Sequence, residues 1–164
     1  MIKKKVVMLG SFAVGKTSLV QRYVNSIFSE KYQTTIGVKI DQKMVTLDNK
    51  DINLLLWDIH GEDDYQKVKP SYLIGASGCF IVIDGTRKAS LDVACELCKM
   101  SKVTIPDASI IVLINKSDIK DEWDLDEDDM TRLNSEGYTV IETSAKLGQG
   151  VDEAFLELTR LMLK

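Results

Sequence analysis

The sequence lacks any apolar run that approaches the ~20 residues of a membrane-spanning helix, which argues against an integral membrane protein. We also expect no secretory signal peptide, because the lysines at residues 3–5 are followed by only four apolar residues before Gly10. Cysteine and histidine are scarce, at three and one. An odd number of cysteines without an export signal indicates reduced thiols, so we expect a cytoplasmic protein.

The same scarcity argues against a zinc site or a redox site. Cys95 and Cys98 have C-x-x-C spacing, but no second pair of cysteines or histidines completes a zinc site. This spacing is also ordinary for two small buried side chains on a helix. We therefore interpret the pair as buried helix residues.

An excess of positive charge is also missing. The 164 residues contain 21 Lys and Arg against 25 Asp and Glu, for a net charge of −4. This balance argues against a nucleic-acid partner. The length and the 45% hydrophobic content are typical of one globular domain, which we expect to span residues 1–164.

Residues 10–17 match the phosphate-binding P-loop pattern G-x-x-x-x-G-K-[ST]. The match lies between an apolar run, which predicts a strand, and the start of a helical pattern, so its amides would point at an anion. Lys16 would reach the outer phosphates, and the Thr17 hydroxyl would ligate Mg²⁺. The alternative is a chance match in a glycine-containing turn.

Apolar runs alternate with helical patterns along the rest of the chain. The alternation predicts an α/β fold with a mostly parallel six-stranded sheet and helices on both faces. The expected strands are residues 1–9, 38–47, 52–57, 79–83, 110–114 and 138–141, and the expected helices are residues 16–26, 91–102 and 151–163. Acidic residues 121–129 are interpreted as a solvated loop and a helix N-terminus.

Polar motifs follow several of the expected strands, where ligand sites of parallel sheets lie. Asp58 comes at the end of a buried strand and is placed to hold Mg²⁺ through water. Residues 115–118, Asn-Lys-Ser-Asp, end a second strand, and residues 144–146, Ser-Ala-Lys, follow the last one. Residues 27–37 predict a long surface loop of the kind that carries function.

With these five motifs in order, the chain resembles a Ras-superfamily small GTPase, most similar to the Rab branch, over nearly all of its length. The resemblance implies a P-loop NTPase fold that binds GTP or GDP with Mg²⁺. The implied nucleotide-binding residues are Ala13, Val14, Gly15, Lys16, Thr17, Ser18, Phe28, Tyr32, Thr35, Gly61, Asn115, Lys116, Asp118, Ser144, Ala145 and Lys146. The implied metal ligands are Thr17, Thr35 and Asp58, and the implied catalytic residues are Lys16, Thr35, Gly61 and Glu62.

Asn115-Lys116-Ser117-Asp118 matches the N-K-x-D motif of guanine specificity in this family. The Asp118 carboxylate can accept two hydrogen bonds from guanine that adenine does not offer. The family also uses the backbone N–H at Ala145 on the guanine carbonyl. The alternatives are a polar turn at the strand end and a helix N-cap region at Ser144.

Three residues depart from the family pattern around the hydrolytic centre. Glu62 replaces a glutamine that orients the attacking water, and a carboxylate cannot donate a hydrogen bond. Phe12 is bulky where relatives have a small residue and where an arginine finger would approach. His60, the only histidine, is expected to turn outward to solvent, and the alternative is a pH-dependent effect on the switch.

Two hypotheses follow. The first is a guanine-nucleotide switch that hydrolyses GTP slowly, and the second is a hydrolysis-impaired, GTP-held interaction module, possibly part of a larger protein. An ATP-using P-loop kinase is disfavoured by N-K-x-D. The resemblance implies effector, exchange-factor and GAP partners at residues 32–40 and 59–74. Because no cysteine for prenylation lies near Lys164, we expect no membrane anchor in this chain, and membrane association would need a further tail.

Overall fold

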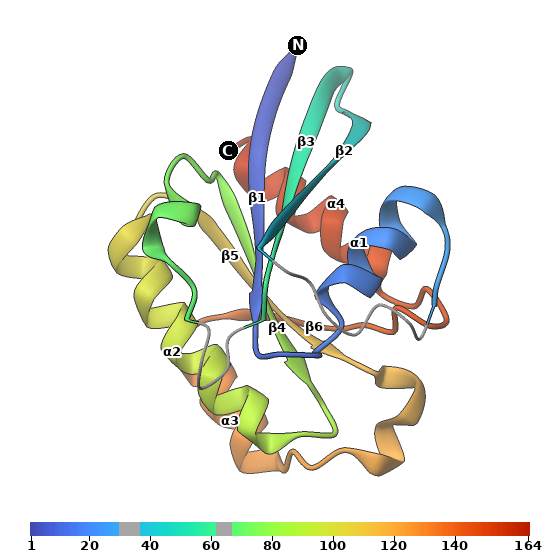
Figure 1. Cartoon of the computed structure of the whole chain (residues 1–164), viewed down its shortest axis with the longest axis vertical. Coiled ribbons are helices and arrows are strands. Elements are labelled where there is room, and N and C mark those ends of the chain that lie inside the picture. The colour runs from blue at the N-terminus through green and yellow to red at the C-terminus, as the bar shows by residue number, and fades with distance from the viewer. Residues whose placement is uncertain (30–36, 62–66) are drawn as a thin grey trace.

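The computed structural model describes residues 1–29, 37–61 and 67–164. Its centre is a six-stranded sheet in the order β2-β3-β1-β4-β5-β6 (Figure 1). The strands β2 and β3 pair antiparallel, and the other neighbours pair parallel. The strands are β1 (Ile2–Gly10), β2 (Val38–Leu47), β3 (Lys50–Ile59), β4 (Gly78–Asp84), β5 (Ser109–Asn115) and β6 (Thr139–Glu142). The predicted mostly parallel α/β sheet is confirmed.

Helices cover both faces of the sheet, as predicted. One core packs beneath α1 (Lys16–Asn25) and α4 (Val151–Met162), and a second packs beneath α2 (Lys88–Thr104) and α3 (Glu127–Ser135) (Figure 1). Two short 3₁₀ helices, η1 (Pro70–Leu73) and η2 (Ser117–Glu122), were not predicted from the sequence. Within the described part of the chain, no helix is long and apolar enough to cross a membrane.

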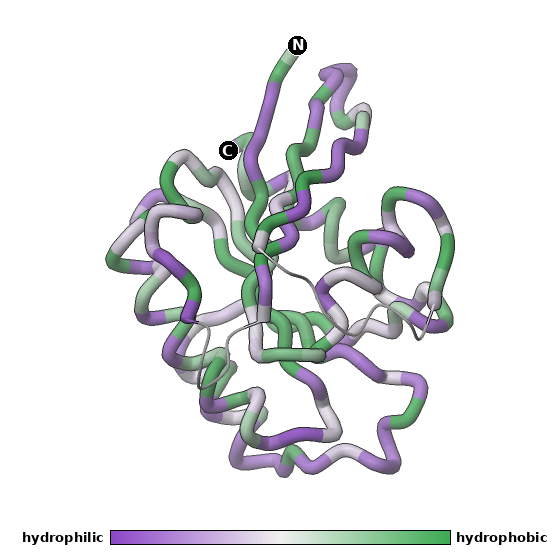
Figure 2. Tube along the Cα trace, viewed as in Figure 1, coloured by the Kyte–Doolittle hydropathy of each residue, from purple (hydrophilic) through white to green (hydrophobic). Residues whose placement is uncertain are grey.

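Burial on both faces explains the apolar runs in the central strands. Every residue of β4 is buried, and β1 becomes fully buried from Val6 onward. Figure 2 shows this hydrophobic centre surrounded by hydrophilic loops. The turn between β2 and β3 has Asp48 and Asn49 in the left-handed region, at φ 52° and 61°, as a two-residue hairpin requires. This turn closes the antiparallel hairpin of β2 and β3 at the edge of the sheet.

The cysteines are free and buried, which confirms the helix interpretation of the C-x-x-C spacing. Cys95 and Cys98 lie on α2, and Cys79 lies on β4. Burial raises the pKa of all three thiols, and raises that of Cys98 to about 11. Because the thiolate is the reactive form, these positions are chemically protected at neutral pH.

Disulfide-reagent labelling of the native protein at pH 7.5 is expected to be slow. A pKa of about 11 for Cys98, against an ordinary value of 9.0, lowers its thiolate fraction ~10²-fold near neutral pH. The rate should increase as the pH rises toward that value. Absorbance of the released thiol measures the reaction, and the same chain in guanidinium chloride is the control. Fast reaction of a native thiol at pH 7.5 would contradict the burial.

Candidate functional site

The P-loop connects β1 to α1 through a tight turn that only glycine fits at one position. Gly15 has φ 103°, and a Cβ on it would lie 2.3 Å from Nδ2 of Asn115. Ala13 also adopts a left-handed conformation, with φ 61°. These conformations bring the loop close to the end of β5.

Lys16 begins α1 and is buried beneath the P-loop. Its Nζ donates to the carbonyl oxygens of Gly10, at 3.3 Å, and Ser11, at 3.0 Å. Burial lowers its pKa to about 8, and the nearby Asp58 carboxylate opposes that change. A buried cation held by neutral carbonyls is a strong attractor for an anion in the loop.

Thr17 and Asp58 bring two oxygen donors together beside Lys16. The Thr17 hydroxyl donates to Oδ2 of Asp58 at 2.6 Å. The Asp58 side chain is buried, which raises its pKa, and its Oδ1 has no hydrogen-bond partner among the described residues. Such hard oxygen atoms, one of them unsatisfied, fit the ligand preference of Mg²⁺.

Asn115 links three segments that are far apart in sequence. Its Nδ2 donates to the carbonyl oxygen of Val14 at 3.1 Å. Its Oδ1 accepts from the Thr143 hydroxyl and from the backbone N–H of Ala145, both at 3.2 Å. The Asn115 side chain therefore fastens the P-loop to the loop after β6.

Asp118 faces the same loop from η2. Its Oδ1 accepts a hydrogen bond from the Ser144 hydroxyl at 2.9 Å. The same hydroxyl accepts from the backbone N–H of Leu147 at 3.0 Å, so Ser144 also stabilises the turn that contains Ala145. The predicted residues from the ends of β5 and β6 are thus brought together.

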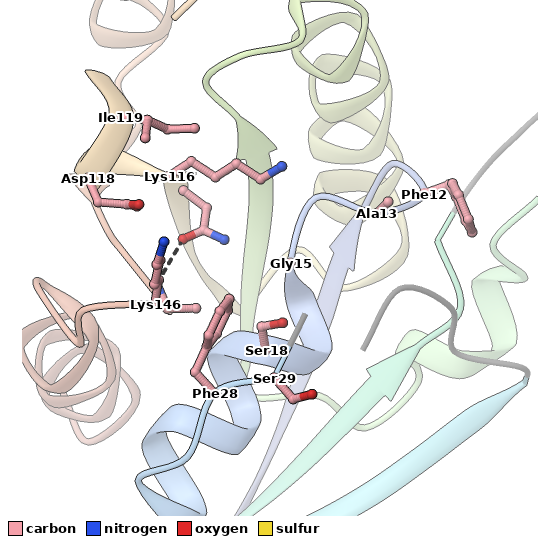
Figure 3. A pocket seen from close by; sticks show the side chains of 12 residues that line it. Phe12, Ala13, Gly15, Ser18, Phe28, Ser29, Lys116, Asp118, Ile119 and Lys146 are labelled. Atoms are coloured by element: carbon pink, nitrogen blue, oxygen red, sulfur yellow. Dashed lines mark hydrogen bonds between the residues drawn. The ribbon is translucent and has the colours of Figure 1, made fainter. Parts of the chain in front are cut away.

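These segments enclose a cavity of about 450 Å³ at the carboxyl end of the sheet. Asp118 and Lys146 lie at one end of it and Phe12 lies at the other (Figure 3). The lining residues are Phe12, Ala13, Gly15, Ser18, Phe28, Ser29, Asn115, Lys116, Asp118, Ile119, Ala145 and Lys146. Its volume is within the range of small-molecule sites.

Asp84, at the end of the buried strand β4, is a site residue that the sequence analysis missed. It accepts from Nζ of Lys116 at 2.8 Å and from Nε of Arg87 at 3.1 Å. Burial opposes ionisation of Asp84, but hydrogen bonds from Lys116 and Thr86 outweigh it and lower its pKa. An acid that directly follows a continuous apolar run, residues 79–83, was the available signal.

Two arginines also support the cavity, and neither was predicted. Arg22, in the last turn of α1, donates Nε to the carbonyl oxygen of Ala145 at 2.7 Å and another N–H to that of Lys146. Arg87 donates to the carbonyl oxygen of Phe12 at 2.5 Å. Both act on backbone atoms of loops far away in sequence, so no local pattern indicates them.

The expectation that His60 turns outward to solvent was wrong. His60 is only 8% exposed. Its imidazole ring lies edge-on to the phenol ring of Tyr72 in η1, and the two ring centroids are 6.2 Å apart. Its backbone N–H donates to the carbonyl oxygen of Gly37 at 2.9 Å. The unpredicted helix η1 covers this side of β3 and therefore buries the ring. A pH-dependent effect of His60 stays a prediction.

Gly61 follows His60 and lies directly against the P-loop. A Cβ on Gly61 would lie 2.5 Å from Cα of Phe12 and 2.9 Å from the Ser11 carbonyl oxygen. The backbone after β3 therefore lies so close to the P-loop that position 61 has room only for glycine, which has no Cβ. The predicted site residues Tyr32, Thr35 and Glu62 lie outside the described residues.

The sheet, the P-loop and the cavity at the carboxyl ends of the strands define a G domain of the P-loop NTPase fold. The Ras family model matches residues 5–164, and the chain belongs to this family. Within the superfamily it is Rab-like. Members of the family are GTPases that bind GTP or GDP with Mg²⁺ and act with effectors and regulators.

Its relatives include several Rab proteins. The chain is 32% identical to Ras-related protein Rab-4 of Dictyostelium discoideum over 161 residues, which is 97% of this chain and 78% of that protein. It is 35% identical to Ras-related protein Rab-21 of the same organism, over 97% of this chain and 76% of that protein. It is 33% identical to Ras-related protein Rab-12 of Mus musculus, over 99% of this chain and 68% of that protein.

Proposed function

We propose that this chain is a guanine-nucleotide switch that binds Mg²⁺ with GTP or GDP and hydrolyses GTP slowly. The observation that carries the proposal is the Asn115 network, which joins the P-loop, the N-K-x-D segment and residues 143–145 around one cavity of about 450 Å³. In this arrangement, groups suited to phosphate and groups suited to guanine face one space.

Guanine recognition is assigned to the end of the cavity at Asp118. Ser144 engages one oxygen of this carboxylate, and a carboxylate accepts several hydrogen bonds, so it can also accept from N1–H and the 2-amino group of guanine. Lys116 and Phe28 line the same cavity and would pack along the base. We assign Tyr32, Ser18 and Lys146 supporting contacts on the ground of their place in the family pattern.

Phosphate and metal binding are assigned to the opposite part of the site. The P-loop amides and Lys16 would hold the phosphates, and the unsatisfied Oδ1 of Asp58 supports a metal position shared with Thr17. Thr35 is proposed to join these ligands when GTP is bound. Mg²⁺, when bound, would offset charge on the phosphate oxygens.

The proposed hydrolysis is an in-line attack of water on the γ-phosphate. Lys16 would stabilise the developing charge, and the Gly61 backbone, which lies against Phe12 and Ser11, is close to the P-loop side where that phosphate would sit. Glu62 can accept a hydrogen bond from water but cannot donate one to phosphate. Slow turnover follows from that difference.

The proposed partner surface comprises residues 32–40 and 59–74. Two apolar side chains on its described part are well exposed, Ile40 at 49% and Ile74 at 61%. Exposed apolar groups next to a site that changes with nucleotide state suit effectors, exchange factors and GAPs. Hydrolysis would then remove the γ-phosphate contacts that order this surface.

The second candidate function is a GTP-held interaction module with impaired hydrolysis. The observation that favours it is the Phe12 side chain, which is 40% exposed at the P-loop end of the cavity. A ring at that position would obstruct the approach of an arginine finger, whose contribution is ~10³ to 10⁵ in rate.

Single-turnover hydrolysis of Mg²⁺·GTP tests both candidates, with the Glu62→Gln and Phe12→Gly variants. Wild-type turnover is expected to be measurable and slow, and Glu62→Gln is expected to raise it by up to ~10²-fold, because the amide adds a hydrogen-bond donor. Turnover absent in the wild type and restored by both substitutions would support the module instead. Failure of the wild type to bind GTP or GDP would refute both.

The Arg22→Ala variant is expected to release bound GDP ~10-fold faster than the wild type. The substitution removes charged donors from the carbonyl oxygens of Ala145 and Lys146, so the loop at the base loses its support from α1. Dissociation of a fluorescent GDP analogue measures the rate. Arg160→Ala, which removes an exposed arginine on α4, is the matched control. Equal rates for Arg22→Ala and the wild type would contradict the role.

A further inference from the structure

Trp123 lies immediately after η2, outside the residues assigned to the nucleotide. Its indole N–H donates to the carbonyl oxygen of Lys116 at 2.9 Å. Its ring lies flat against the chain after β4, since a Cβ on Gly85 would lie 2.3 Å from Cε2 of the indole. The neighbouring backbone holds it there, because the N–H of Asp124 donates to the Gly85 carbonyl oxygen at 2.8 Å.

The carbonyl that Trp123 holds belongs to a strained turn. Lys116 is a non-glycine residue in the left-handed region, at φ 71° and ψ 38°. Its carbonyl oxygen also accepts from the N–H of Ile119 at 3.1 Å, which closes the turn around Asp118. The N–H of Ser117 donates to the Thr143 carbonyl oxygen at 2.9 Å. The direction of this turn decides where the Asp118 carboxylate points.

We infer that Trp123 is a positioning residue for guanine recognition, which holds the Lys116–Asp118 turn through its indole N–H. The inference rests on the proposed function and adds a specificity residue to it. Trp123 does not line the 450 Å³ cavity and would act only through the Lys116 carbonyl. It lines instead a second groove of about 390 Å³ on the outer side of η2 and α3.

The geometry separates this role from a merely structural one. Without the indole N–H, the Lys116 carbonyl oxygen keeps its hydrogen bond from Ile119, so no buried acceptor is left unsatisfied and the stability should change little. The turn, however, loses the contact that fixes it against Gly85 and β4. The loss should therefore appear in base selectivity more than in folding.

Two substitutions disturb the contact from opposite sides. Trp123→Phe keeps an aromatic ring and removes the N–H donor. Gly85→Ala keeps the indole but adds a methyl group where the ring now lies. Met130→Ala is the matched control, because Met130 lines the same outer groove and packs on the same core without touching the turn.

The test compares affinity for GDP with that for inosine diphosphate, IDP, which lacks the 2-amino group that Asp118 would accept. Isothermal titration calorimetry with Mg²⁺ gives both constants. The preference of GDP over IDP is expected to fall ~3- to 10-fold in Trp123→Phe and in Gly85→Ala, and to stay unchanged in Met130→Ala. Thermal unfolding should show a small change in Trp123→Phe.

An unchanged preference of GDP over IDP in Trp123→Phe would overturn the inference, because the indole N–H would then be dispensable. This holds even if the Gly85→Ala variant lost that preference. An equal loss of affinity for both nucleotides in all three variants would also overturn it and indicate a structural role. A wild type with no preference for GDP over IDP would instead refute the proposed guanine recognition itself. The two failures are therefore distinguishable.

Discussion

The Gly15→Ala variant is expected to lose affinity for GDP by ~10³-fold while the protein still folds. The added Cβ would lie 2.3 Å from Nδ2 of Asn115, and the position requires φ 103°, which a side chain rarely adopts. To relieve the contact, Asn115 must leave the Val14 carbonyl oxygen. The P-loop then separates from the loop that would hold the base.

The magnitude comes from two contributions of similar size. Left-handed strain at a non-glycine residue costs ~1–3 kcal/mol. A buried polar group that loses its partner costs another ~1–3 kcal/mol, and Asn115 makes three hydrogen bonds. A sum near 4 kcal/mol corresponds to ~10³ in affinity.

Gly75→Ala is the matched control for this experiment. Gly75 also has a left-handed backbone, at φ 83°, but a Cβ there would meet no described atom within 4 Å. It therefore carries the conformational strain without the collision at the site. Calorimetric titration with GDP and thermal unfolding of both variants separate the two effects. GDP affinity for Gly15→Ala within a few-fold of that for Gly75→Ala would contradict the collision.

The Asp118→Ala variant is expected to lose most of its preference for GDP over ADP. We expect the ratio of the two affinities to fall by up to ~10⁴-fold. A protein site that hydrogen-bonds a polar group of its ligand discriminates by ~10⁴ to 10⁵ against a ligand without that group. In the proposed function, the Asp118 carboxylate is the site group that accepts hydrogen bonds from guanine. Ser144, which now donates to Asp118 at 2.9 Å, would remain but cannot replace a charged acceptor. Phosphate contacts at the P-loop are unchanged.

Competition of GDP and ADP against a fluorescent nucleotide measures the preference. Asp121→Ala is the control, because it removes an exposed carboxylate from the same segment, η2. We expect that variant to keep the wild-type preference. Equal selectivity in Asp118→Ala and in the wild type would show that guanine is recognised elsewhere, and would remove the main argument for the orientation of the base.

Much of the fold could be predicted because its signals are local. Apolar runs such as residues 79–83 are continuous where β4 is covered on both faces, and the P-loop pattern joins a strand to a helix. The strand pattern on either side of Asp48 and Asn49 lies in β2 and β3, which the two-residue turn joins. The helix η1 gave no such signal, and its omission led to the wrong expectation for His60, which η1 buries.

The candidate site also contains residues that local sequence signals predicted and residues that they did not. The residues that would touch the ligand, among them Lys16, Asp58 and Asp118, lie in short motifs at strand ends and were predicted. Other residues that hold those motifs in place, among them two arginines, were not predicted. Arg22 reaches Ala145 across 123 positions, and Arg87 reaches Phe12 across 75. Such partners are brought together by the packing of the sheet, and no spacing in the sequence indicates them.

The sequence by itself therefore determined the order of the strands, the P-loop and the polar motifs after β3, β5 and β6, because backbone conformation and burial depend largely on neighbouring residues and their periodicity. Only the tertiary structure decided that Asn115 joins two loops, that Asp84 pairs with Lys116 and that the Trp123 ring lies against Gly85. These contacts depend on the parallel register of β4, β5 and β6, which brings their carboxyl ends to one edge. The physical reason is that a side chain's partner is set by distance in space, which the sheet supplies, rather than by separation along the chain.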